Sequence, residues 1–177
     1  MPTAEPTWLT LPPLGEEISD ELKSAMESFD AGERPAARAA TSWLRDQALS
    51  AYETSRTRVL VADGQVAGFY ALASSQVALR QRDRRRLAFD LAVVQIPAAL
   101  VTWIARDKRA AVEGRTLLLH AVATARRASA LQATAVLAVD PFDEETDEMW
   151  RKAFGFRPSS EPGTLKRLWL PLRAVVD

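Results

Sequence analysis

Cysteine is absent from the 177 residues of the chain, and histidine occurs once, at His120. Without thiols the chain has no disulfide framework, no thiolate metal site and no cysteine nucleophile. A zinc site or a serine triad normally needs histidine within a set of ligands or partners, so a lone histidine argues against both. We therefore predict a protein that works without a bound metal.

Long apolar runs and an excess of one charge are missing too. No stretch reaches the ~18 to 20 apolar residues of a membrane span, and the N-terminal stretch lacks the basic segment and apolar core of a signal peptide. Lys and Arg together number 23, as do Asp and Glu, so the formal net charge is zero. This balance argues against a protein that coats nucleic acid. The sequence predicts a cytoplasmic protein with no membrane association.

The charges that are present gather in segments. Residues 1–33 are acidic, residues 80–86 hold a cluster of arginines around Asp83, and residues 140–148 are acidic again. The basic segment has two interpretations. It is either a solvated loop or a set of contacts to nucleic-acid phosphates, because arginine binds phosphate bidentately and such contacts dominate affinity. The residues predicted for such contacts are Arg82, Arg84 and Arg85.

Apolar residues make up 47% and charged residues 26% of the chain, which is ordinary for a soluble globular protein. Prolines at positions 2, 6, 12 and 13 predict an irregular lead-in over residues 1–15, followed by a single domain over 16–177. Asp63-Gly64 between two apolar runs predicts a β-hairpin. The predicted helices are 16–29, 36–49, one beginning near Gly114, and 143–153. The predicted strands are 58–62, 65–72, 93–105, 134–139, 154–156 and 165–172, with a loop or short helix over 80–90.

This order resembles the fold of the GNAT acetyltransferase superfamily, and several stretches are similar to the toxins in it that acetylate aminoacyl-tRNA. These stretches are Phe29-Asp30-Ala31-Gly32 with Trp43-Leu44, Val66 to Ala73, Ile96 to Asp107, and Phe154-Gly155-Phe156-Arg157-Pro158 with Leu168 to Leu172. The resemblance spans about residues 28–172. It implies an α/β (α+β) fold, with a mixed, mostly antiparallel sheet of six to seven strands flanked by helices.

The resemblance also implies acetyl-CoA as co-substrate. In this family the pantetheine of acetyl-CoA pairs with the backbone of the long strand, where that strand splays from its neighbour. The corresponding residues here are Trp103, Ile104 and Ala105. No metal is implied.

The family's pyrophosphate loop, Q/R-x-x-G-x-G/A, opens the next helix and falls on residues 111–116, where Gly114 alone matches. Backbone N–H groups and the positive end of a helix dipole suit a phosphate, whereas Glu113 opposes one. The alternative is a plain loop leading into a packed helix. The residues predicted to hold the pyrophosphate are Arg109, Gly114, Arg115 and Thr116.

A second departure concerns the catalytic acid. The family usually carries a tyrosine three residues before F-G-F, which protonates the departing CoA thiolate, and Arg151 stands at that position. Arginine is always protonated and donates a proton poorly, so the sequence predicts that Arg151 assists by its charge. The two tyrosines, Tyr52 and Tyr70, lie elsewhere in the chain. Some acetyltransferases work mainly by proximity, so a missing acid slows the reaction without abolishing it.

The sequence thus predicts an N-acyltransferase that acylates a primary amine. The resemblance implies the aminoacyl group of charged tRNA as acceptor, with a block of translation and a cognate antitoxin as partner. The rewritten loop and the missing tyrosine favour an alternative, a catalytically inactive GNAT-like domain that binds or regulates. A small-molecule N-acetyltransferase is a second alternative, against which the toxin-like opening of the chain argues.

Four further residues are given roles by their positions. His120 lies at the flank of a helical stripe, where it is either a partly exposed residue or a base. Trp150 is predicted to be a core or interface residue. Trp8 and Trp169 are predicted to be exposed, which leaves room for a homodimer.

Overall fold

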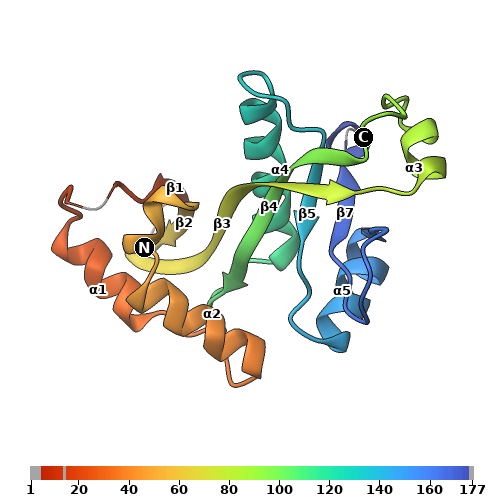
Figure 1. Cartoon of the computed structure of the whole chain (residues 1–177). Coiled ribbons are helices and arrows are strands. Elements are labelled where there is room, and N and C mark those ends of the chain that lie inside the picture. The colour runs from red at the N-terminus through yellow and green to blue at the C-terminus, as the bar shows by residue number, and fades with distance from the viewer. Residues whose placement is uncertain (1–4, 14, 176–177) are drawn as a thin grey trace. The chain divides into compact units, whose positions relative to one another are not determined.

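The strands form a seven-stranded sheet in the order β1-β2-β3-β4-β5-β7-β6. Figure 1 labels all of these strands except β6. The computed structural model describes residues 5–13 and 15–175. The strands are β1 Thr7–Thr10, β2 Arg56–Ala62, β3 Gln65–Ala78, β4 Gln95–Arg106, β5 Val136–Val139, β6 Arg157–Pro158 and β7 Leu168–Pro171. The helices are α1 Asp20–Ser28, α2 Pro35–Asp46, α3 Gln81–Arg86, α4 Gly114–Ser129 and α5 Glu144–Phe154, with 3₁₀ turns at Ser50–Glu53 and Leu172–Val175.

Most neighbours in this sheet are antiparallel, namely β1 with β2, β2 with β3, and β7 with both β5 and β6. The pair β4 and β5 is parallel and runs from Ala98↔Val136 to Val101↔Val139. Val139 is the last residue of β5, so β4 continues to Arg106 beyond its last pair with that strand. A mixed, mostly antiparallel sheet with helices confirms the predicted fold class.

Contacts between Cα atoms divide the chain into two compact units. Unit 1 comprises residues 1–73 and 102–121, and unit 2 comprises residues 74–101 and 122–177. Strands β3 and β4 and helix α4 each contribute residues to both units. The single domain expected over residues 16–177 stays a prediction.

Unit 1 contains the hairpin that Asp63-Gly64 predicted. Asp63 and Gly64 have φ values of 49° and 72°, the left-handed pair that a two-residue turn between twisted strands requires. Against this hairpin lies β1, paired with β2 from Thr7↔Val61 to Thr10↔Arg58. The prediction of an irregular lead-in is therefore wrong for residues 7–10. Prolines 6 and 12 lie outside the strand, at positions where a missing N–H costs the ladder nothing.

In unit 2, β5 is buried along its whole length, and Trp169 of β7 is fully buried. The prediction that Trp169 is exposed is wrong, because β7 pairs on one edge with β5 and on the other with β6. Phe154-Gly155-Phe156 is not a strand either. Phe154 ends α5, and Gly155 caps that helix in the left-handed conformation with a φ of 72°.

The acidic run before α5 acts as a helix start, as predicted. Asp143 accepts a hydrogen bond from the backbone N–H of Thr146, and the Thr146 hydroxyl accepts one from the backbone N–H of Asp143. This reciprocal capping box satisfies two backbone donors at the first turn. Trp150, on the same helix, is buried against Phe154 and Phe156, which confirms its assignment to the core.

Candidate functional site

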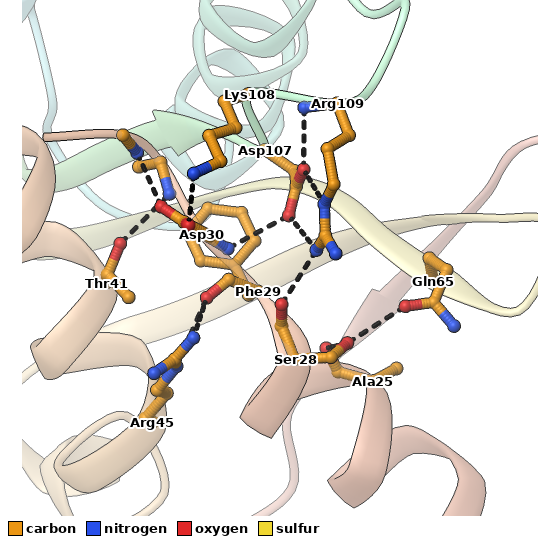
Figure 2. A network of polar contacts seen from close by, with 12 residues as sticks. Ala25, Ser28, Phe29, Asp30, Thr41, Arg45, Gln65, Asp107, Lys108 and Arg109 are labelled. Atoms are coloured by element: carbon orange, nitrogen blue, oxygen red, sulfur yellow. Dashed lines mark hydrogen bonds and ion pairs between the residues drawn. The ribbon is translucent and has the colours of Figure 1, made fainter.

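The loop that follows β4 is organised by the buried carboxylate of Asp107 (Figure 2). Asp107 accepts hydrogen bonds from the backbone and side chain of Arg109, at 2.7 to 2.9 Å, and from the backbone N–H of Asp30 at 2.9 Å. Its own N–H donates to the carbonyl of Ala67 in β3. One side chain thus joins the start of this loop to the end of α1, 77 residues away in sequence.

This environment lowers the pKa of Asp107 to about 2, chiefly because the Arg109 side chain donates hydrogen bonds to its ionised form. The backbone N–H groups of Arg109 and Asp30 act in the same direction, and burial opposes them. The Arg109 side chain is hydrogen-bonded within the protein, since besides Asp107 it also donates to the carbonyl of Ser28 at 2.7 Å. Its charge is largely offset by Asp107. Arg109 is therefore less suited to bind a phosphate than the sequence suggested.

Asp30 forms a second link between the same segments. Its carboxylate lies 2.7 Å from the ammonium of Lys108, and it also accepts a hydrogen bond from the backbone of Gly32. The pKa of Asp30 is lowered, first by the hydrogen bond from Lys108. The N–H of Lys108 donates to the Asp30 carbonyl. The Phe29-Asp30-Ala31-Gly32 stretch therefore does more than stop α1, because it anchors the loop that leads from β4 to α4.

The three predicted strand residues lie on β4 with their side chains on alternate faces. Trp103 and Ala105 pack against the cluster that contains Phe29 and Trp43, and the rings of Trp103 and Trp43 stack with centroids 5.6 Å apart. Ile104 packs instead against Leu117 of α4 and its neighbours. The side chains of all three residues are thus partly buried by packing.

Helix α4 begins at Gly114, as the sequence predicted, and its first three residues are exposed. A Cβ atom added to Gly114 would meet no atom within 4 Å, and its φ lies outside the left-handed region. The first turn carries no acidic residue, although Glu113 directly precedes it and is exposed. Arg115 and Thr116 therefore present a cation and a hydroxyl at an open helix N-terminus, the part of a helix that favours anions.

Gly68 allows α4 to approach the sheet at this point. A Cβ atom at Gly68 would lie 2.8 and 2.9 Å from the two δ-carbons of Leu117, and 3.2 Å from the carbonyl oxygen of Ala105. Any side chain at position 68 would therefore force Leu117 to shift within its buried site. The V-A-G-F-Y stretch of β3 sets the distance between α4 and the strand that carries Trp103 to Ala105.

An aromatic cluster on β1, β3 and α4 was missed by the sequence reasoning. The buried Tyr70 hydroxyl lies 2.9 Å from Nδ1 of His120, and the His120 ring stacks on Trp8 with centroids 3.8 Å apart. His120 is half-buried, so it is a partly exposed residue with two aromatic partners. The cluster was missed because strand β1 was not predicted. Trp8 reaches the cluster only because residues 7–10 pair with β2.

The remaining predicted residues belong to unit 2. Arg151 is exposed on α5 and lies 3.4 Å from Asp147, one helical turn earlier. Arg82 and Arg85 are exposed on α3, whereas Arg84 is buried. The Arg84 guanidinium donates to the carbonyls of Leu91 at 2.6 Å and Val93 at 2.9 Å. Arg84 thus holds the segment after α3 in place and is not free to contact a phosphate.

Over residues 5–13 and 15–175, no helix combines the length and apolarity that crossing a membrane demands. Within the same ranges, no three His, Cys, Asp or Glu side chains gather as metal ligands.

No family model matches the chain, and no curated protein matches its sequence. Solved structures do match over nearly the whole chain. AtaT complexed with acetyl-methionyl-tRNAfMet superposes with a TM-score of 0.75 at 22% identity, covering 97% of this chain and 97% of that one. AtaTR bound with AcCoA gives a TM-score of 0.67 at 22% identity, with 96% and 94% coverage. A tyrosine-to-phenylalanine mutant of KacT gives 0.70 at 18% identity, with 94% and 96% coverage.

The chain has the GNAT fold. AtaT and KacT are GNAT-fold toxin acetyltransferases, so the predicted resemblance is confirmed at the level of the fold. The agreement extends over both units, since each comparison covers more than nine tenths of the chain. The roles of individual residues in the GNAT fold of this chain stay predictions.

Proposed function

We propose that the chain is an acetyl-CoA-dependent N-acetyltransferase of the toxin type, and that its acceptor is the amino group of an aminoacyl-tRNA. The observation that carries the proposal is the open start of α4, where Gly114, Arg115 and Thr116 are exposed directly after β4 and its loop. The similarity to AtaT complexed with acetyl-methionyl-tRNAfMet supports the acceptor class. A cognate antitoxin is proposed as partner, because AtaT has been solved with the antitoxin AtaR.

The residues present fit acetyl-CoA. Backbone N–H groups in the first turn of a helix have no partner within the helix. At α4 the N–H of Thr116 donates to the carbonyl of Glu113, and the N–H groups of Gly114 and Arg115 are accompanied by the Arg115 side chain and the Thr116 hydroxyl. These groups would hold the pyrophosphate, while the backbone of Trp103 to Ala105 would hold the pantetheine. Acetyl-CoA supplies the activated acetyl group. The chain fixes the site through Asp107 and Asp30, which tie the β4–α4 loop to the end of α1.

Gly114→Glu is expected to weaken acetyl-CoA binding at least tenfold, because a carboxylate would occupy the space proposed for the pyrophosphate and repel it. The substitution should leave the fold intact, since nothing lies within 4 Å of the new Cβ. Calorimetric titration with acetyl-CoA measures the effect. Ala123→Glu is the matched control, as it adds the same charge at an exposed position of the same helix. Equal affinities for the two variants would remove the α4 start from the site.

Arg151 is proposed to stabilise negative charge on the departing thiolate, without transferring a proton. Its partner Asp147 offsets part of that charge, but the side chain is half exposed and their separation is 3.4 Å. Arg151→Ala should lower kcat by about tenfold to a hundredfold, less than the roughly hundredfold to thousandfold loss for a donor in a water-excluded site, because the Arg151 side chain is half exposed. The Kd for acetyl-CoA should not change.

Lys152→Ala is the control for Arg151→Ala. Lys152 is exposed on the same helix and pairs with Glu148, also one turn earlier. Its loss should leave kcat unchanged. If both variants have the same kcat as the wild type, Arg151 has no part in the reaction.

A second candidate function is favoured by two observations. Arg151 occupies the position of the family's acid, and Glu113 stands exposed beside the proposed pyrophosphate site. Both would suit a GNAT-like protein that binds partners without catalysis. Release of free CoA thiol in the presence of charged tRNA separates the two candidates, and a panel of small amines tests the small-molecule acceptor. Binding of acetyl-CoA without thiol release from any acceptor would favour the binding protein.

A further inference from the structure

Unit 2 contains a cleft that is lined almost entirely by arginine. Its volume is about 390 Å³, and its walls come from α3 with the residue before it, and from β6. One carboxylate and one proline complete the lining. The lining residues are Arg80, Arg82, Asp83, Arg86, Arg157 and Pro158.

The four guanidinium groups of this arginine cleft take no part in hydrogen bonds or ion pairs within the described residues, although that of Arg157 lies over the Trp169 ring. Two other arginines of unit 2, Arg84 and Arg167, behave differently. Arg84 is buried on two backbone carbonyls, and Arg167 forms a bidentate pair with Asp140, with both distances 2.8 Å. Four cations facing one carboxylate leave the arginine cleft with an excess of about three positive charges.

The surrounding structure gives the cleft a fixed frame. Arg84 anchors the segment after α3, on the same helix that carries Arg82 and Arg86. Arg157 pairs with Trp169 in the sheet, and its guanidinium lies 5.7 Å from the centre of that buried ring. The four guanidinium groups repel one another, and the single carboxylate of Asp83 offsets only one of their charges. The excess of positive charge therefore favours an external anion.

We propose that the arginine cleft binds phosphate groups of an RNA backbone. Arginine matches phosphate through bidentate hydrogen bonds and stays charged at every relevant pH. No aromatic residue lines the cleft, so it offers no surface on which a base could stack. This lining favours recognition of the sugar–phosphate backbone over recognition of a nucleotide base. The inference rests on the proposed function, since it assigns a phosphate contact to the RNA acceptor.

The arginines that line the cleft differ from those that the sequence predicted for phosphate contacts. The sequence predicted phosphate contacts from Arg82, Arg84 and Arg85. The structure places only Arg82 in the cleft, buries Arg84, and leaves Arg85 outside the lining. Arg157, which the sequence reasoning did not single out for this role, joins it from a strand 71 positions after Arg86 (157 − 86).

The test is fluorescence anisotropy with a short labelled RNA duplex that carries no aminoacyl group, titrated with the full-length protein. Arg86→Gln and Arg157→Gln should each weaken binding about tenfold, as expected for loss of a charge-assisted hydrogen bond. Each should also reduce the slope of log K against log salt by about 1. Arg127→Gln is the control, because Arg127 is an exposed arginine of unit 2 outside the cleft. Circular dichroism confirms that the variants are folded.

Two results would overturn the proposal. In the first, Arg85→Gln or Arg127→Gln weakens RNA binding as much as Arg157→Gln, which would mean that charge in general binds the RNA. In the second, ATP or inorganic phosphate displaces the RNA when its concentration is no higher than the concentration of phosphate groups in the RNA. This result would make the ligand a small phosphate compound. Neither measurement needs acetyl-CoA or acyl transfer. Failure of the arginine cleft is therefore distinguishable from failure of the proposed enzyme activity.

Discussion

Asp107→Ala is expected to lower the free energy of unfolding by about 2 to 3 kcal/mol. The substitution removes the acceptor of four hydrogen bonds, from Asp30 and Arg109. It also leaves Arg109 without its carboxylate, and the backbone N–H of Asp30 without its acceptor. The half-exposed guanidinium of Arg109 regains water, which keeps the loss below that of a fully buried pair. Urea denaturation followed by circular dichroism measures the change.

Glu148→Ala provides the comparison for Asp107→Ala. Glu148 pairs with Lys152 on the surface of α5, and both side chains are largely exposed. Such a pair contributes less than about 1 kcal/mol, so this variant should unfold close to the wild type. Equal stability of the two variants would show that the Asp107 network adds nothing to the fold.

The Asp107 carboxylate also makes the stability of the protein depend on pH. The pKa of Asp107 is about 2 in the folded protein, against 3.8 for an unperturbed aspartate. Because the folded pKa is the lower one, the stabilisation is complete above about pH 5 and is lost as the pH falls toward about 2. The difference corresponds to about 2 kcal/mol. The stability gap between the wild type and Asp107→Asn should therefore narrow between about pH 5 and about pH 2.5, whereas a constant gap would contradict the assignment.

Gly68→Val is expected to cost about 3 kcal/mol or more, or to prevent folding. The first added carbon already lies within 2.9 Å of both δ-carbons of Leu117. Leu117 is 1% exposed and cannot move into solvent, and the Ala105 carbonyl limits movement on the other side. Helix α4 must then shift away from β3, which would also displace the proposed acetyl-CoA site. Thermal denaturation and acetyl-CoA titration report the two effects.

A double variant tests whether the stability lost by substitution at position 68 comes from steric crowding against Leu117. Leu117→Ala opens the space that a Cβ atom at position 68 would need, so Gly68→Ala should cost less in its presence than alone, a departure from additivity. Gly114→Ala serves as the glycine control, because its Cβ would meet nothing within 4 Å and its φ is not positive. Additive losses from Gly68→Ala and Leu117→Ala would contradict the close approach of α4 to β3.

The elements that the sequence predicted best are those governed by local chemistry. Asp-Gly specified the β2–β3 turn because few residues adopt two successive left-handed conformations. Gly114 located the start of α4, and the acidic run located the start of α5, where carboxylates favour the helix dipole and cap backbone N–H groups. Strand β1 was missed for the complementary reason. Four residues among prolines carry little periodic signal, and their pairing partner lies about 50 positions away in β2.

The candidate site divides in the same way. The stretch that holds Trp103 to Ala105, and the first residues of α4, were placed from the sequence because a long apolar strand followed by a helix is visible in its periodicity. The sequence could not show which of two adjacent arginines is buried and which is exposed. Arg84 is buried and Arg85 exposed because the backbone carbonyls of residues 91 and 93 return over one face of α3.

The sequence by itself determined the hairpin, the helix starts and, apart from β1 and residues 154–156, the order of helices and strands, because each depends on residues near one another along the chain. Together with the resemblance, this order predicted the GNAT fold. The tertiary structure alone decided that Asp107 joins Asp30 and Arg109, that Gly68 admits Leu117, and that Arg157 shares a cleft with Arg80, Arg82 and Arg86. These groupings depend on burial and on contacts between distant segments. Burial and distant contacts also decide which charges are neutralised and which remain available to a ligand.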